Sequence, residues 1–143
     1  MKQEHIEQAR HNAGFLAYLE GNIPDSFFDW KVTVCFYQAL HLVRAYLYTQ
    51  GVEESTSHDH TLRCINPAAR DKPTLYVPMP DVYRWYFKLH QLSMAARYAG
   101  FLQKRSFEQQ QRESLEKAKH CLTVIRQALT TRNFTWEPVP KAE

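Results

Sequence analysis

The sequence predicts an all-α protein: an antiparallel four-helix bundle with a long loop or short helix between its second and third helices. Three observations support this. First, apolar residues recur three and four positions apart in four segments. Second, only 4 of the 143 residues are Gly, and no segment shows the alternation of apolar and polar residues that is typical of a strand. Third, hydrophobic residues make up 44% of the chain, which is enough for a core. We expect residues 1–132 to form one domain and 133–143 a proline-containing tail, from which Phe134 and Trp136 can fold back.

The first helix is expected over residues 2–20. Its apolar stripe has helical spacing and consists of Ile6, Ala9, Ala13 and Leu16. Gly21 and Asn22 then form a typical C-terminal signal, and Pro24 cannot continue the helix.

The second helix is expected over residues 26–50, with Asp25 or Ser26 as its N-cap and Gly51 at its end. This segment is apolar on most of its circumference. Such a helix must be covered on nearly all sides, so it is either the central helix of the bundle or part of an oligomer interface as well.

The remaining elements are a loop and two helices. Residues 52–79 contain three prolines and predict a long loop, with a short helix within 60–69. The third helix is expected over 81–102, and the fourth begins near Ser106, which forms a capping-box pattern with Gln109.

The composition excludes several classes of protein. Lys and Arg number 18 and Asp and Glu 15, so the net charge of +3 permits an acidic partner but is far below that of a histone-like binder. No glycine-rich phosphate loop or zinc-protease motif occurs, and we expect no cofactor. No apolar run reaches the length of a membrane span, and no secretory signal starts the chain, so we expect no membrane association.

The three cysteines, Cys35, Cys64 and Cys121, are an odd and scattered number. They indicate reduced thiols and a cytoplasmic protein. Cys35 and Cys121 lie within apolar helical patterns, which predicts buried and unreactive thiols and not nucleophiles.

A weak metal-binding pattern occurs at the start of the long loop. His58, His60 and Cys64 are three zinc-type ligands in one segment. The alternative is a solvated loop in which Asp59 caps a helix, and we favour that alternative.

Arg84 and His90 have the spacing Arg-x5-His. An Arg that holds a phosphate and a His that moves a proton are the minimum for cleaving RNA through its 2′-hydroxyl. However, six residues turn a helix by about 600°, which places the two side chains about 120° apart. We therefore interpret both as surface residues.

A second basic group lies at the end of the third helix. Arg97 can pair with an anion, Tyr98 can stack or donate, and Lys104 and Arg105 add positive charge nearby. The alternative is a structural ion pair of Arg97 with solvated basic neighbours.

With these motifs the chain resembles the HEPN domains, helical bundles of prokaryotic single-domain proteins, toxin–antitoxin pairs and RNA-processing proteins. Residues 35–47 are similar to the aromatic-rich helix of the family, Ser57 and His58 to the Ser-His that follows it, and Arg97 with Tyr98 to the Arg-Tyr pair further on. The resemblance covers about residues 15–129. It implies that His58 lines a ligand site together with Arg97, Tyr98, Lys104 and Arg105.

Active HEPN members cut RNA with an Arg, four to six residues and a His. After Arg97 the corresponding positions hold Leu102, Gln103 and Lys104. The resemblance therefore implies a non-catalytic protein that binds a nucleotide, RNA or a protein partner. The alternatives are a metal-independent endoribonuclease of toxin type and a purely structural interaction module.

The expected partners follow from surface aromatics and from the family. A small bundle cannot bury every aromatic of its second helix, such as Trp30, Tyr37 and Tyr48, so we expect a homodimer. Non-catalytic HEPN members often accompany a nucleotidyltransferase-like protein, which the resemblance implies as a further partner.

Overall fold

The computed structural model describes residues 2–52, 57–98 and 104–136, except for the side chains of 98 and 104–108. All regular secondary structure in these ranges is helical, which confirms the all-α prediction. The helices are α1 (Lys2–Asn22), α2 (Phe28–Thr49), α3 (His58–Ile65), α4 (Pro80–Tyr98) and α5 (Lys104–Thr130).

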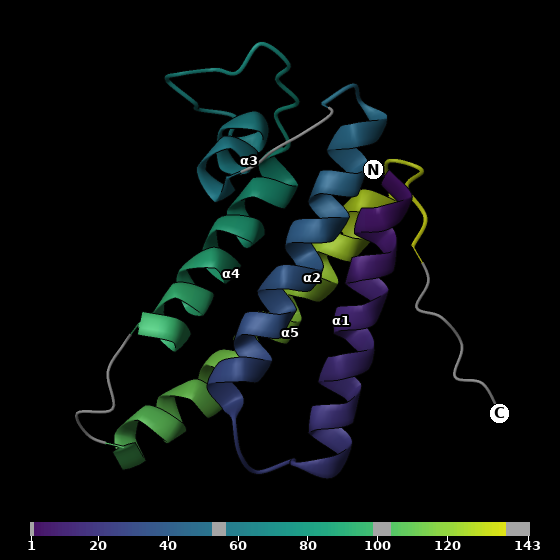
Figure 1. Ribbon diagram of the computed structural model, residues 1–143. Coiled ribbons are helices and arrows are strands. Elements are labelled where there is room, and N and C mark those ends of the chain that lie inside the picture. Colours follow the sequence, from purple (N-terminus) through teal and green to yellow (C-terminus); the bar gives the residue numbers. More distant parts are fainter. Residues whose placement is uncertain (1, 53–56, 99–103, 137–143) are drawn as a thin grey trace, which may run out of the picture.

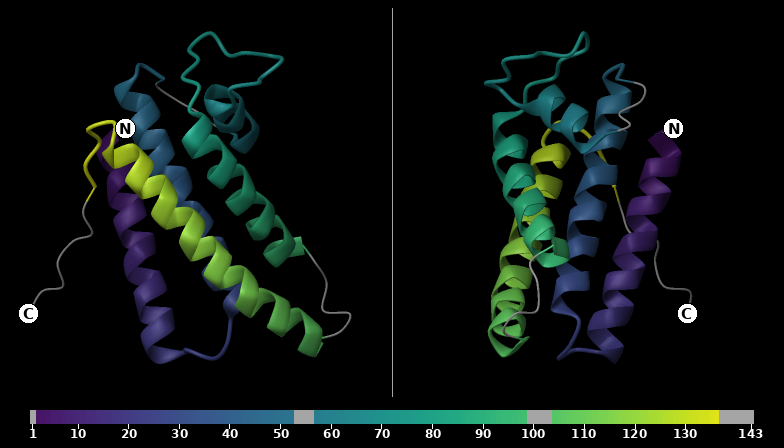
Figure 2. Two further views of the ribbon diagram at one scale, coloured as in Figure 1. Left: turned by 180° about the vertical axis from the view of Figure 1, so that it is seen from behind. Right: turned by 60° about the vertical axis from the view of Figure 1, so that its left-hand side comes forward.

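Helix α2 is the centre of the molecule. It packs against α1, α4 and α5, while α5 also packs against α4 (Figure 1). Seen from behind, α5 runs obliquely to α1 and α2 and lies alongside α4, and the short α3 lies across the end at which α4 begins (Figure 2). Val32, Cys35, Phe36 and Ala39 of α2 are completely buried. The continuous apolar pattern of this segment therefore reflects its central position.

The start of α2 differs from the prediction that Asp25 or Ser26 caps it. Phe27 occupies the N-cap position with φ 58° and makes no side-chain cap bond. The turn is instead held from inside the helix, because the Lys31 ammonium donates to the carbonyl of Ile23 at 2.6 Å and to that of Pro24 at 3.3 Å. At the other end, Gly51 has φ 94°, which suits its predicted role as a helix terminator.

The segment between α2 and α4 contains the short helix that the sequence predicts, shifted to His58–Ile65. Its N-cap is Ser57, whose side chain accepts from the backbone N–H of His60, and not Asp59. The chain after α3 runs back along it, where Val77 and Met79 donate to the carbonyls of Cys64 and Ile65, both at 2.9 Å. The segment therefore covers one end of the bundle.

Helices α4 and α5 also have shifted ends. Helix α4 begins at Pro80 and is described as far as Tyr98, and residues 99–102 of the predicted helix lie outside the described part of the structure. Helix α5 begins at Lys104, so Ser106 lies inside the helix and is not its N-cap. After α5, Phe134 and Trp136 fold back and are buried.

The three cysteines are buried and form no disulfide. Cys35 is completely buried, as its sequence context predicts, and burial raises the pKa of its thiol to about 12, so the thiol is protonated at pH 7. That this thiol is unreactive stays a prediction. Within the described residues, no helix combines the length and apolarity that crossing a membrane requires.

Candidate functional site

Five polar side chains from three helices meet beside the core and form what we call the basic cluster: Tyr37 and Arg44 of α2, His58 of α3, and His90 and Arg97 of α4. The ring centroids of His58 and His90 are 5.7 Å apart. These residues span 60 positions of the chain, so the packing of α3 and α4 against α2 brings them together.

The position of His58 follows from the start of α3. Ser57 accepts from the backbone N–H of His60 at 3.1 Å, which fixes the first turn and places His58 at its beginning. The Arg44 guanidinium donates to the Thr61 hydroxyl at 3.2 Å and joins this turn to α2. The His58 ring then lies 5.4 Å from the ring of Phe36, centroid to centroid.

His90 and Arg97 lie on the same face of α4. The His90 ring packs 5.1 Å from the Phe36 ring, so both imidazoles contact one core aromatic. Arg97 Nη1 donates to the Tyr37 hydroxyl at 2.9 Å, and its guanidinium carbon lies 5.7 Å from the centre of that ring. Arg97 also donates to the backbone carbonyl of Ser93 at 3.3 Å, which fixes its direction.

The electrostatics of the basic cluster disfavour further positive charge. Burial lowers the pKa of His58, and the nearby positive charges of Arg44, His90 and Arg97 lower it further. Burial also lowers the pKa of His90, and Arg97 adds to that effect. Both imidazoles are therefore neutral at pH 7, beside two permanent guanidinium charges.

Two buried polar atoms of this region have no hydrogen-bond partner in the described part of the chain. They are Nδ1 of His58 and the hydroxyl oxygen of Tyr86, a completely buried residue. The Tyr86 ring packs 5.6 Å from Phe36, the same ring that His58 and His90 contact. Buried polar atoms without a hydrogen-bond partner are uncommon in folded proteins, and a role in binding or catalysis is one explanation for them.

An aromatic strip continues from the basic cluster along α4. Tyr83, Phe87 and Met94 share a helical face with His90 and Arg97, since these positions are spaced four, three, four and three residues apart. The Tyr83 and Phe87 rings are stacked at 5.7 Å. Phe87 is 38% exposed and Met94 41%, so the strip faces solvent beside the two histidines.

The structure thus brings together three predicted site residues, His58, His90 and Arg97. It separates Arg84 from His90, as the helical geometry predicts, because Arg84 lies over the Trp85 ring at 5.1 Å. Three further predicted residues cannot be placed in the site: the side chains of Tyr98, Lys104 and Arg105 lie outside the described part of the structure.

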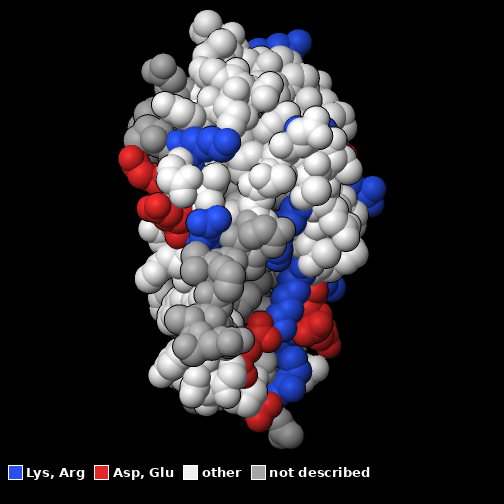
Figure 3. Space-filling model, turned by 90° about the vertical axis from the view of Figure 1, so that its right-hand side faces the viewer, with Lys and Arg blue, Asp and Glu red and all other residues white. Residues whose placement is uncertain are grey.

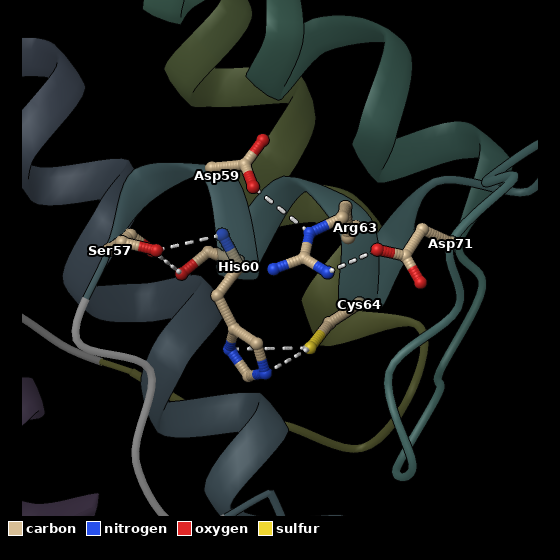
Figure 4. A network of polar contacts seen from close by, with 7 residues as sticks. Ser57, Asp59, His60, Arg63, Cys64 and Asp71 are labelled. Carbon is tan, nitrogen blue, oxygen red and sulfur yellow. Dashed lines mark hydrogen bonds and ion pairs between the residues drawn. The ribbon is translucent and has the colours of Figure 1, made fainter.

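The candidate metal ligands do not converge. His60 contacts the sulfur of Cys64 (Figure 4). The His58 ring lies instead near the His90 ring, with 5.7 Å between their centroids. Arg63 lies between Asp59 and Asp71 at 3.0 and 3.4 Å and neutralises the carboxylates of this turn. Among the described residues, no group of three or more His, Cys, Asp or Glu could hold a metal ion.

Sequence reasoning did not assign Tyr37 and Arg44 to the site. They are seven residues apart and therefore lie on one face of α2. Arg44 lies on the narrow polar side of an otherwise apolar helix, and this is the signal that could have identified it. Nothing in the sequence indicates which other element that polar side faces.

The opposite side of the molecule has a different charge pattern. Figure 3 shows the face toward α1, where Lys and Arg side chains form a broken column with Asp and Glu side chains beside it. Such interleaved charges are typical of a solvated surface and not of a nucleic-acid interface.

Similarity to known proteins gives no indication of the function of this chain, so the functional argument depends on the basic cluster. No family model matches the chain, and neither the curated proteins nor the solved structures include a match.

Proposed function

We propose that this chain is a HEPN-like, up-and-down helical bundle that binds the phosphate of RNA or of a nucleotide at the basic cluster, without chemistry. The observation that supports this most is the convergence of His58, His90 and Arg97 from distant parts of the sequence. Two guanidinium groups and two imidazoles that face one another gain stability when an anion binds between them.

The aromatic strip favours a nucleic acid or nucleotide over a simple anion. Phe87 and Tyr83 offer ring faces on the same side of α4 as His90 and Arg97. Phe87 and Arg97 are ten residues apart on α4, about 15 Å along the helix, so a base stacked on Phe87 and a phosphate beside Arg97 would belong to different nucleotides of one strand. Stacking of bases on aromatic side chains with basic residues beside them is the usual mode of single-strand binding.

The unpartnered polar atoms fit the same function. Nδ1 of His58 and the Tyr86 hydroxyl are buried near the site. A ligand that carries acceptor oxygens could receive a hydrogen bond from His58 after that ring takes up a proton, and would so relieve the cost of leaving this atom without a partner.

As part of this proposal the functional unit is a homodimer. Phe27 and Trp30 at the start of α2 are 54% and 57% exposed, more than a large aromatic side chain usually is. A second copy that covers these rings would bury them. A nucleotidyltransferase-like protein is the further partner that the HEPN resemblance suggests.

The proposal is tested by fluorescence anisotropy with a labelled single-stranded RNA oligonucleotide. Wild-type protein should bind it with an affinity that falls with salt, since phosphate contacts release counterions. Arg97→Ala should weaken binding, whereas Arg84→Ala, which removes an exposed Arg of the same helix, should not. Equal affinity of wild type and Arg97→Ala would assign the chain to the protein-interaction alternative.

A second candidate function is metal-independent RNA cleavage. The 5.7 Å separation of the His58 and His90 rings favours it, because one imidazole could act as base on the 2′-hydroxyl and the other as acid on the leaving oxygen. The lowered pKa of both rings opposes it, since a general acid must hold a proton. Cleavage in the presence of a chelator that is lost in both His58→Ala and His90→Ala would establish this function.

A further inference from the structure

A group of basic and aromatic side chains on the outside of α4 and α5 is separate from the basic cluster. We call it the Trp85 patch, and it consists of Arg84, Trp85 and Lys88 of α4 and His120 of α5. The two helices lie side by side (Figure 2). The Trp85 and His120 rings join them across this surface, with 5.2 Å between their centroids.

Trp85 is the fixed centre of the patch. Its side chain is partly buried and packs against the hydrophobic core, and His120 meets its ring at 85°. The Arg84 guanidinium carbon lies 5.1 Å and Lys88 Nζ 5.8 Å from the centre of the indole, both within the range of a cation–π contact. One ring therefore holds two positive groups that α4 presents one helical turn apart.

The contacts with Trp85 do not neutralise these two charges. Arg84 and Lys88 are exposed, and neither side chain forms a hydrogen bond or an ion pair within the described part of the chain. A guanidinium stacked on an indole keeps its charge and its forked donors, which match the two oxygens of a carboxylate.

The acidic side chains described on the same two helices have basic neighbours of their own. Asp81, one turn before Trp85, binds Arg132 through two bonds of 2.5 and 2.8 Å. On α5, each described acidic side chain has a lysine about one turn further along: Lys117 for Glu113 and Lys119 for Glu116. The positive charge of Arg84 and Lys88 therefore remains available to an acidic partner.

The patch suits carboxylates better than a nucleic acid. The core, His120 and two cations already surround the Trp85 indole, so it has little free surface on which a base could stack. Phe87, on the other side of α4, is more exposed than Trp85 and has no such cover.

We propose that the Trp85 patch docks an acidic helix of a partner protein, whose Asp or Glu side chains accept hydrogen bonds from Arg84 and Lys88. Acidic residues four positions apart on a helix lie about 5–6 Å from each other, and Arg84 and Lys88 have the same spacing on α4. This docking surface is independent of the proposed function, because it uses no residue of the basic cluster.

The test is fluorescence anisotropy of the full chain with a labelled, end-capped alanine peptide that carries Glu at every fourth position. A peptide of about 16 residues is long enough to form a helix. Wild-type protein should bind it with an affinity that falls with salt, and the same peptide with Gln in place of Glu should not bind. In nitrogen-15 NMR spectra, the Glu peptide should shift the indole N–H signal of Trp85, which Trp85→Phe assigns.

Variants with matched charge changes locate the binding. Arg84→Gln and Lys88→Gln should each weaken peptide binding about fivefold, the upper end for one exposed ion pair. Arg70→Gln removes an exposed Arg from the segment after α3 and should leave the affinity unchanged. Arg97→Ala should also leave peptide binding unchanged, so failure of the basic cluster and failure of the Trp85 patch are distinguishable.

Three results would overturn the proposal. They are equal affinity for the Glu and Gln peptides, an unmoved Trp85 signal, and a loss in Arg70→Gln as large as that in Arg84→Gln. If Arg84→Gln weakens binding of the RNA oligonucleotide as much as binding of the peptide, the patch belongs to a nucleic-acid surface, and the assignment to an acidic helix is wrong.

Discussion

Two sets of buried or half-buried cations in this molecule have opposite surroundings. Lys119 pairs with Glu20 at 2.7 Å, Arg132 pairs with Asp81 through two bonds of 2.5 and 2.8 Å, and Lys31 donates to backbone carbonyls. In the basic cluster, by contrast, the groups that act on the His58 pKa are themselves basic. The first set, which we call the paired cations, stabilises the fold, and the second has a charge pattern that an anionic ligand would complete.

The largest effect is expected at a paired cation. Lys31 is 1% exposed, and Lys31→Ala would leave a cavity and take the donor from the carbonyls of Ile23 and Pro24. We expect a loss of about 3 kcal/mol in the free energy of unfolding, measured with urea. Lys31→Met keeps most of the volume and should cost about 1 kcal/mol.

Because Lys31 belongs to the paired cations and not to the basic cluster, we expect its substitution to lower the stability without weakening RNA binding. Folded Lys31→Met should bind the RNA oligonucleotide as well as wild type does. Weakened RNA binding with unchanged stability would place Lys31 in the binding surface and remove the distinction between the two sets.

The next largest effect is expected in the basic cluster. Arg97→Ala should weaken RNA binding between about tenfold and a hundredfold, the range for losing hydrogen bonds to a charged group. The side chain is half-buried and packs on Tyr37, so we also expect a stability loss of about 1 kcal/mol. Arg97→Lys keeps the charge and loses the forked geometry, and it should recover only part of the affinity.

How far the sequence predicts this molecule differs between fold and site. The heptad-like spacing of Leu115, Leu122 and Leu129 predicts α5, and the apolar circumference of α2 predicts a central helix, because both are properties of one segment. The N-cap at Phe27 could not be predicted, because Lys31 holds that turn from within the helix. Short-range chemistry thus predicts elements better than their ends.

The site was predictable only in part for a related reason. His58, His90 and Arg97 were each candidates, but the sequence assigned them to separate hypotheses: a metal site, an Arg–His pair and an anion site. Their meeting depends on how α3 and α4 pack on Phe36 of α2. A single sequence does not show how one helix packs against another. The sequence therefore indicated only an oligomer contact for Tyr37.

A smaller effect is expected in the pH dependence of RNA binding by the basic cluster. The pKa values of His58 and His90 are lowered in the free protein, and a bound phosphate should raise them. RNA binding should therefore strengthen several-fold as the pH falls from about 8 to about 6, while these rings take up protons. The measurement is anisotropy at constant ionic strength.

The same shifts affect the stability of the free protein in the opposite direction. A histidine whose folded pKa lies below its unfolded value of about 6.5 contributes fully above that pH, and its contribution is lost as the pH falls. The unliganded protein should therefore lose stability only below about pH 6.5, at the acidic end of the window in which RNA binding strengthens. His90→Gln should reduce both trends, and pH-independent binding would contradict phosphate recognition by the histidines.

The smallest effect is expected at the exposed end of the paired cations. The hydrogen bond from Arg132 lowers the pKa of Asp81, so its contribution is present above the unfolded pKa near 4 and is lost as the pH falls below it. Because the Asp81 side chain is 51% exposed, solvent screens the pair, and Asp81→Asn should cost only about 0.5 kcal/mol in urea unfolding at pH 7. The difference between wild type and Asp81→Asn should disappear once the pH falls below the lowered pKa of Asp81, since the wild-type carboxyl is then protonated. RNA affinity should not change, and a change would show that the pair at the start of α4 positions His90 and Arg97 further along the same helix.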